Sequence, residues 1–177
     1  MIKKKLFSVL IICFCLSTSY SVGAESADTG NEEREGDKTV LKRTKVTSEY
    51  EKAEKMIFAG KKLEKKNKLN KAKIKYGKAY EYLIKANREY PAQPDILDYL
   101  GFTSWKLEKN EEAEIYYLLG LDIEPNHIRL NEHLGEHYVA TKRINKANKI
   151  LKVLKACNCK EYFELKEIIE GTKKSKY

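Results

Sequence analysis

Three glycines in this chain are each followed, twelve residues later, by an alanine. The pairs are Gly60 with Ala72, Gly101 with Ala113, and Gly135 with Ala147. The second and third pairs lie 34 residues apart, and both of their glycines follow a leucine. A repeat of this length predicts stacked helix pairs, each of which buries its apolar face against the next pair. We therefore expect an all-α repeat fold, and a binding scaffold is the leading class of function.

The first 24 residues have the features of an export signal. Three lysines at positions 3–5 precede an apolar run of eleven residues, and small residues end at Ala24, where a signal peptidase would cut. The run is shorter than the ~20 residues that span a bilayer. We therefore predict a signal peptide over residues 1–24, a periplasmic or secreted protein, and no stable membrane insertion after cleavage. An uncleaved anchor is the alternative.

Composition divides the rest of the chain into a linker, a domain and a tail. Residues 25–47 are charged and poor in large apolar side chains, so we expect a disordered linker there. Residues 48–171 are rich in helix formers and predict one all-helical domain, and residues 172–177 form a short tail. Loss of the three lysines in residues 1–24 lowers the formal charge from +9 to +6. This mixed surface, on an exported chain, makes nucleic acid an unexpected partner.

The repeated positions resemble the tetratricopeptide repeat (TPR), whose signature is W-x2-L-G-x2-Y, then A-x3-F, then P. Residues 94–127 match it best, with Leu100, Gly101, Ala113, Tyr117 and Pro125. Residues 128–161 form a second match, in which Leu151 replaces the aromatic residue. The resemblance implies a solenoid of three repeats with a capping helix over residues 161–170, ended by Gly171.

The first copy, residues 53–93, is longer than the other two. Gly60 and Gly101 are 41 residues apart, which is seven more than the repeat length. Seven residues are close to two helical turns, so the insertion keeps the same face of the helix toward the core. Tyr76 and Ala79 indeed recur as Leu83 and Ala86. We therefore predict one long helix over residues 70–89.

In TPR proteins the first helix of each pair lines a concave groove that binds peptides. The resemblance therefore implies a groove that binds a segment of another protein. Its lining would be Phe58, Lys61, Asp98, Tyr99, Phe102, Trp105, Arg129, Glu132, His133 and Glu136. Trp105, the only tryptophan, is the best anchor candidate. The alternative is that these aromatic residues pack inside the stack.

One TPR branch grips the C-terminal carboxylate of chaperones with Lys, Arg and Asn side chains. Asp98 and Phe102 stand at the comparable places, so that branch is disfavoured. Because three helix pairs make only a short groove, self-association into a homo-oligomer stays open. A further alternative is a structural part of an envelope secretion or pilus assembly, contacted through the convex face and the long helix.

His133 to His137 match H-x-x-E-H, a spacing used by some zinc peptidases. The repeat already explains Leu134 and Gly135 within it, and no third ligand is evident. We therefore predict no enzyme, no metal and no cofactor, with a metal-dependent hydrolase as the disfavoured alternative.

Two other short segments leave alternatives open. Cys157 and Cys159 can form a disulfide in an exported protein, or Cys157 can be a small buried apolar residue in reduced form, or the pair can bind metal or another chain. The lysine-rich residues 61–75 form either a solvated turn or a contact with anionic lipid or polymer.

Overall fold

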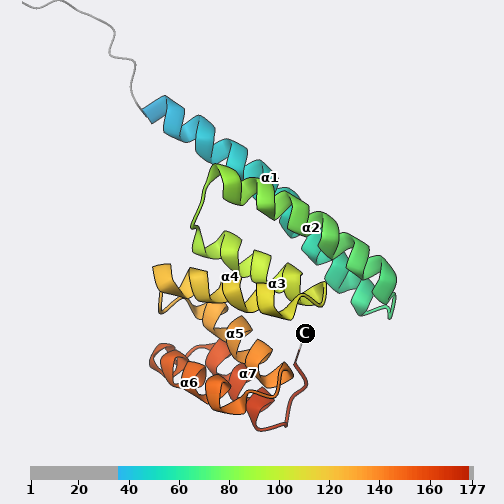
Figure 1. The fold of residues 1–177 in the computed structure, drawn as a ribbon, viewed down its shortest axis with the longest axis vertical. Helices are drawn as coiled ribbons and strands as arrows, with labels where there is room; N and C mark the ends of the chain where they lie inside the picture. The colour runs from blue at the N-terminus through green and yellow to red at the C-terminus, as the bar shows by residue number, and fades with distance from the viewer. Residues whose placement is uncertain (1–35, 176–177) are drawn as a thin grey trace, which may run out of the picture. The chain divides into compact units, whose positions relative to one another are not determined.

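The computed structural model describes the backbone of residues 36–175 and the side chains of residues 48–175. The predicted signal peptide therefore lies outside the described residues. Seven α-helices and one short 3-10 helix make up this part of the chain, which contains no strand (Figure 1). They are α1 (Gly36–Glu64), α2 (Leu69–Glu89), α3 (Pro94–Lys106), α4 (Asn110–Ile123), α5 (Ile128–Ala140), α6 (Ile144–Leu154), η1 (Lys155–Cys157) and α7 (Lys160–Ile169). The predicted all-α fold is confirmed.

The helices pack as three successive hairpins with a seventh helix at the end. α1 pairs with α2, α3 with α4, and α5 with α6, while α7 packs on both helices of the last pair. Neighbouring hairpins meet where α2 contacts α3, where α4 contacts α5, and where α3 contacts α5 (Figure 1). This is the predicted solenoid of three repeats with a capping helix. Each helix pair covers an apolar face of the neighbouring pair, which that pair could not bury by itself.

The turn inside each hairpin has the same geometry. Asn67, Glu108 and Lys142 adopt positive φ angles of 55°, 65° and 61° at equivalent places in the three repeats. In each turn, the residue that follows the one with positive φ donates its backbone N–H to the carbonyl of the residue five positions earlier. Lys109, for example, donates to Ser104 at 3.0 Å. This left-handed ending satisfies helix carbonyls that would otherwise lack partners. The repeat therefore extends from the core to the connections.

The long second helix is confirmed with almost the predicted bounds, because α2 runs from Leu69 to Glu89. Leu83 and Ala86 in the seven-residue insertion are as fully buried as Tyr76 and Ala79. Pro91 follows the helix, and Pro94 occupies the first turn of α3, where its missing N–H costs nothing. The insertion thus lengthens the first hairpin without changing which face it buries.

The predicted linker differs from the structure. α1 begins at Gly36, so residues 36–47 are helical in backbone, whereas residues 25–47 were expected to be disordered. Residues 25–35 lie outside the described part. Extending an existing helix costs far less than nucleating a new one, and no proline interrupts this segment. The polar composition of residues 36–47 therefore did not prevent α1 from beginning before residue 48.

Candidate functional site on the concave face

The predicted groove residues lie on α1, α3 and α5, but their exposure is uneven. Five of them are exposed or half-buried: Phe58, Lys61, Tyr99, Trp105 and Arg129. The other five are buried: Asp98, Phe102, Glu132, His133 and Glu136. The expectation that Tyr99, Phe102 and Trp105 form one exposed aromatic surface is therefore wrong for Phe102. The side chains at this place are used mainly to join one hairpin to the next.

A charged network connects α3 and α5 around Asp98. Its fully buried carboxylate forms an ion pair with Arg129, whose Nε lies 2.6 Å away, and lies 2.6 Å from His133 Nδ1. Burial alone would raise the pKa of Asp98, but its interactions with His133 and Arg129 outweigh burial and hold the pKa below its usual value. The prediction that Asp98 and His133 face a partner is not supported by this geometry, because each already pairs with the other.

Arg129 lies at one end of the face formed by α1, α3 and α5, which carries the predicted groove residues and which we call the concave face. Its guanidinium lies 4.5 Å from the centre of the Tyr99 ring and also bonds exposed Asp95 at 2.9 Å. The Tyr99 ring in turn packs against Tyr50 of α1, with ring centres 5.5 Å apart. α1, α3 and α5 are thus joined at this end by stacked rings and one guanidinium. Tyr50 lies one turn before the first repeat, so the repeat pattern did not mark it.

Two lysines from different hairpins converge on the ring of Phe102. Lys61 Nζ lies 4.5 Å from the ring centre, and Lys106 Nζ lies 5.7 Å from it. Lys106 also donates to Glu64 of α1 at 2.9 Å. On its other side, Phe102 meets the Tyr76 ring edge to face at 5.7 Å. The middle of the concave face therefore combines positive charge with aromatic carbon.

Trp105 stands one helical turn beyond Phe102 on α3 and is half-buried. Its ring meets the ring of His137 edge to face, with centres 5.2 Å apart. His137 is fully buried, and neither of its ring nitrogens has a hydrogen-bond partner among residues 48–175. Burial, aided by the nearby charge of Arg143, lowers the pKa of His137 to about 4. One side of the Trp105 ring thus packs against a neutral imidazole, while part of its surface stays accessible to solvent.

The two histidines of the H-x-x-E-H segment face different surroundings. His133 pairs with Asp98, whereas His137 packs among the rings of Trp105, Tyr117 and Tyr138. Within residues 48–175, no group of three His, Cys, Asp or Glu side chains is arranged to hold a metal ion. The segment therefore gives no support to a zinc site, in line with the repeat-based explanation of its sequence.

Two residues of the C-terminal segment contact α5 and α7. The Ser175 hydroxyl donates to the Glu136 carboxylate, and Lys173 Nζ bonds Glu164 of α7 at 2.9 Å. Serine and lysine in a short tail carry no sequence signal for such a contact, so it was not predicted.

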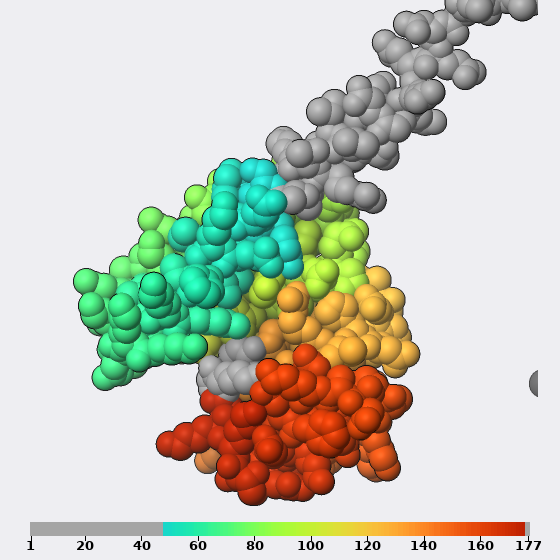
Figure 2. Space-filling model, turned by 180° about the vertical axis from the view of Figure 1, so that it is seen from behind, coloured from blue at the N-terminus to red at the C-terminus, as the bar shows by residue number. Residues whose placement is uncertain are grey.

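Figure 2 shows the molecule from the side where the first hairpin, cyan to green, and the last helices, red, lie on either side of the middle of the stack.

Cys157 and Cys159 are joined by a disulfide just before α7. Of the alternatives left open for this pair, the buried, reduced Cys157 is wrong, because Cys157 is exposed and bonded to Cys159. The helix ends before this pair, in the 3-10 turn and at Asn158, which has a left-handed φ of 47°. The chain is therefore free of the helical geometry that would keep the two sulfurs apart.

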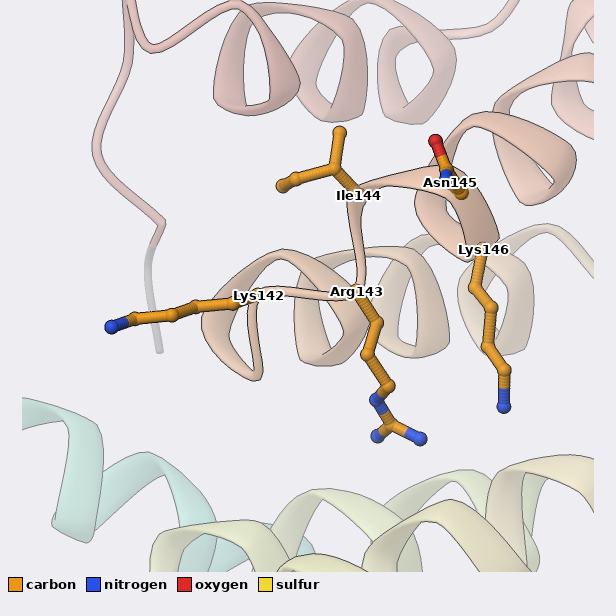
Figure 3. A pocket seen from close by; sticks show the side chains of 5 residues that line it. All are labelled: Lys142, Arg143, Ile144, Asn145 and Lys146. Carbon is orange, nitrogen blue, oxygen red and sulfur yellow. The ribbon is translucent and has the colours of Figure 1, made fainter.

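A small hollow of about 340 Å³ lies at the turn between α5 and α6 (Figure 3). Arg143 and Lys146 extend side by side from it, and both reach Glu114 of α4, at 2.6 and 3.4 Å. These cations connect the second hairpin to the third.

None of the described helices has both the length and the apolar composition needed to cross a bilayer.

The comparisons with known proteins agree with this geometry. No protein-family model matches the chain. A TPR repeat-containing protein of Pseudomonas aeruginosa is 37% identical over 62 residues, which are 35% of this chain and 10% of the relative. The chain therefore spans about a tenth of the length of this curated relative.

Two solved TPR domains have a similar fold. The first TPR domain of Spaghetti (RPAP3), bound to the HSP90 peptide SRMEEVD, has a TM-score of 0.51 and 20% identity over 70% of this chain and 97% of that domain. The second TPR domain of human RPAP3, in complex with the HSP70 peptide SGPTIEEVD, has a TM-score of 0.52 and 14% identity over 71% of this chain and 98% of that domain. The three hairpins, their shared turns and these likenesses define the class of fold: the described part of the chain has the fold of a TPR solenoid.

Proposed function

We propose that this chain is an adaptor that binds a segment of another protein on the concave face of α1, α3 and α5. One observation carries the proposal: Lys61 and Lys106, from two different hairpins, converge on one aromatic ring beside the half-buried Trp105. A tryptophan held in place by its neighbours offers a large contact area at little entropic cost, which is typical of an anchor in an interface. The exposed Lys61 adds attraction for acidic or aromatic side chains, whereas Lys106 already pairs with Glu64.

The similar TPR domains support a peptide as the ligand. Both were solved with short chaperone peptides that carry two consecutive glutamates. A chaperone peptide itself is not part of our proposal, because the comparable places hold Asp98 and Phe102, and both are buried. We propose instead a peptide with an aromatic and an acidic residue, to match Trp105 and Lys61.

Catalysis is not part of the proposed role. The polar groups on the concave face, such as Asp98 and His133, pair with each other across helices instead of converging on open space. We further propose that the adaptor acts outside the cytoplasm, on the strength of the signal-like residues 1–24. Support for that location comes from the sequence alone.

Selection from a displayed peptide library against the purified protein tests the binding role. Trp105→Ala and Lys61→Glu should each weaken the selected peptides by about 10-fold or more. Lys152→Glu, an equal charge reversal at an exposed position on α6, is the matched control and should change affinity less than about 2-fold. Peptides that bind all three variants equally well would contradict the groove as the binding site.

A further inference from the structure

The tip of the first hairpin carries most of the net charge of the chain. Residues 61–78, which we call the basic tip, contain nine lysines and one glutamate, a net charge of +8. The entire chain has a formal net charge of +9. Figure 2 shows this tip at the left edge of the molecule, in teal and green. Such a concentration at one end of a mixed-charge chain is a long-range electrostatic feature that needs an explanation.

The carboxylates at the tip neutralise few of these lysines. Glu64, the only acid within it, is engaged by Lys106 of α3, and Glu108 of the next turn lies 3.3 Å from Lys73. Among the described residues, no carboxylate lies within ion-pair distance of the following exposed lysines: Lys62, Lys65, Lys66, Lys68, Lys71 and Lys78. Their mutual repulsion costs stability, and a polyanionic surface would relieve it.

The backbone presents these lysines in a defined arrangement. The turn is closed by hydrogen bonds from the N–H groups of Asn67 and Lys68 to the carbonyls of Glu64 and Leu63, at 2.7 and 2.9 Å. On α2, Lys71, Ile74 and Lys78 share one face, because they are three and four residues apart. That face is opposite to the one that buries Ala72, Tyr76 and Ala79.

Large apolar side chains accompany the lysines. Leu69 and Ile74 within the basic tip are each 60% exposed. Leu69 opens α2 at the tip, and Ile74 lies between Lys71 and Lys78. Exposed apolar residues set among cations are what an anionic bilayer interface accepts, since the lipid headgroups attract the lysines and the acyl boundary takes the apolar side chains.

We propose that the basic tip binds the surface of an anionic lipid bilayer through the face of α2 that carries Lys71, Ile74 and Lys78, with Ile74 entering the interface. A soluble polyanion such as nucleic acid would bind the lysines but would leave the Ile74 side chain in water. Apart from Lys61, which borders both, this binding surface lies outside the predicted groove residues and does not depend on the peptide-binding role. It would hold the adaptor at a membrane while the groove remains available.

Sedimentation with lipid vesicles tests the proposal on the chain without residues 1–24, which represents the form expected after signal cleavage. Vesicles of phosphatidylcholine mixed with phosphatidylglycerol should bind the protein, and vesicles of phosphatidylcholine alone should not. Replacing Lys65, Lys66, Lys68 and Lys71 with glutamine should weaken binding by at least about 100-fold. The matched control replaces Lys142, Lys149, Lys152 and Lys155, four exposed lysines on the third hairpin and the turn that follows α6, and should keep binding within about 5-fold.

The apolar contribution needs its own pair of variants. Ile74→Ser should weaken vesicle binding by about 5-fold, whereas Ile115→Ser on α4, which removes an equally exposed isoleucine, should leave it unchanged. Circular dichroism melts establish that all four variants fold. Equal losses from the two lysine sets, or equal binding to both vesicle types, would overturn the proposal. Binding to single-stranded DNA as tight as to vesicles, and indifferent to Ile74→Ser, would overturn it in favour of a soluble polyanion.

Discussion

The side chain of Leu165 packs directly against the backbone of Gly135, joining the capping helix to the first helix of the third pair. In the first two pairs, the equivalent glycines Gly60 and Gly101 instead meet a tyrosine ring from their own hairpin. The third pair has a leucine at the corresponding position, and that leucine is only half-buried. α7 therefore supplies the missing side chain and completes the third repeat as well as covering it.

Gly135→Ala should destabilise the domain by about 1–3 kcal/mol, because the added Cβ overlaps the Leu165 side chain. Urea unfolding followed by circular dichroism measures this change. Gly77→Ala is the matched control, since a Cβ there has no neighbour within 4 Å. It should stabilise the domain by about 0.5–1 kcal/mol, through the better helix propensity of alanine. Equal effects of the two substitutions would contradict the packing of Leu165 on Gly135.

Much of this packing could be predicted from the sequence because the repeat is a local pattern. The spacing of Gly101 and Ala113, and the recurrence of Tyr76 as Leu83, were enough to predict the hairpins and the long second helix. The partner of Gly135 could not be predicted in this way. Leu165 lies 30 residues further along and outside the repeat, so only the docked position of α7 reveals the contact.

Asp98→Asn should destabilise the domain by about 2–4 kcal/mol, because it leaves the charge of Arg129 without its buried partner. Asp95→Asn removes the exposed ion pair of the same arginine and should cost less than about 1 kcal/mol. Chemical denaturation at neutral pH compares the two. The lowered pKa of Asp98 also determines how the stability of the domain depends on pH. The stabilisation by ionised Asp98 is complete above pH ~4, which is the pKa of aspartate in the unfolded chain, and it is lost as the pH falls below that value. A small loss equal to that of Asp95→Asn would mean that the network contributes little to stability.

His137 should make the domain less stable in mild acid. Its pKa is about 4 in the folded protein, whereas the unfolded chain takes up the proton near pH 6.5. Between these values the unfolded state binds more protons, so the free energy of unfolding falls as the pH decreases from 7 to 4, by about 2 kcal/mol.

The His137→Phe variant isolates this effect, because phenylalanine keeps the ring contacts with Trp105 and does not titrate. Urea unfolding at pH 7 and pH 5 should show a smaller loss of stability in the variant than in the natural chain. The same loss in both proteins would assign the acid sensitivity to other groups.

The candidate site was predicted less well than the fold, for a physical reason. The repeat places ten side chains on α1, α3 and α5, but their exposure depends on partners far away in the sequence. Asp98 pairs with His133, 35 residues on, and Glu136 accepts from Ser175, 39 residues on. Helix periodicity assigns a residue to a face and contains no information about which polar groups meet across helices.

The contact of Ser175 with Glu136 leads to a further prediction. Removing residues 173–177 takes away Ser175, whose hydroxyl donates to Glu136 of α5, one of the predicted groove residues. A peptide selected against the full chain should bind the shortened chain several-fold more tightly, because it no longer competes with the tail. Isothermal titration with both proteins measures the difference. Equal or weaker binding by the shortened chain would show that the tail does not compete for the groove.

The emission of Trp105 tests the central claim, that the concave face binds a peptide, most directly. As the only tryptophan, Trp105 reports on its own surroundings without interference. A selected peptide should shift and saturate the Trp105 emission, with the same Kd as an independent binding measurement, and Lys61→Glu should raise both values together. A peptide that binds tightly while the emission of Trp105 stays constant would contradict the account.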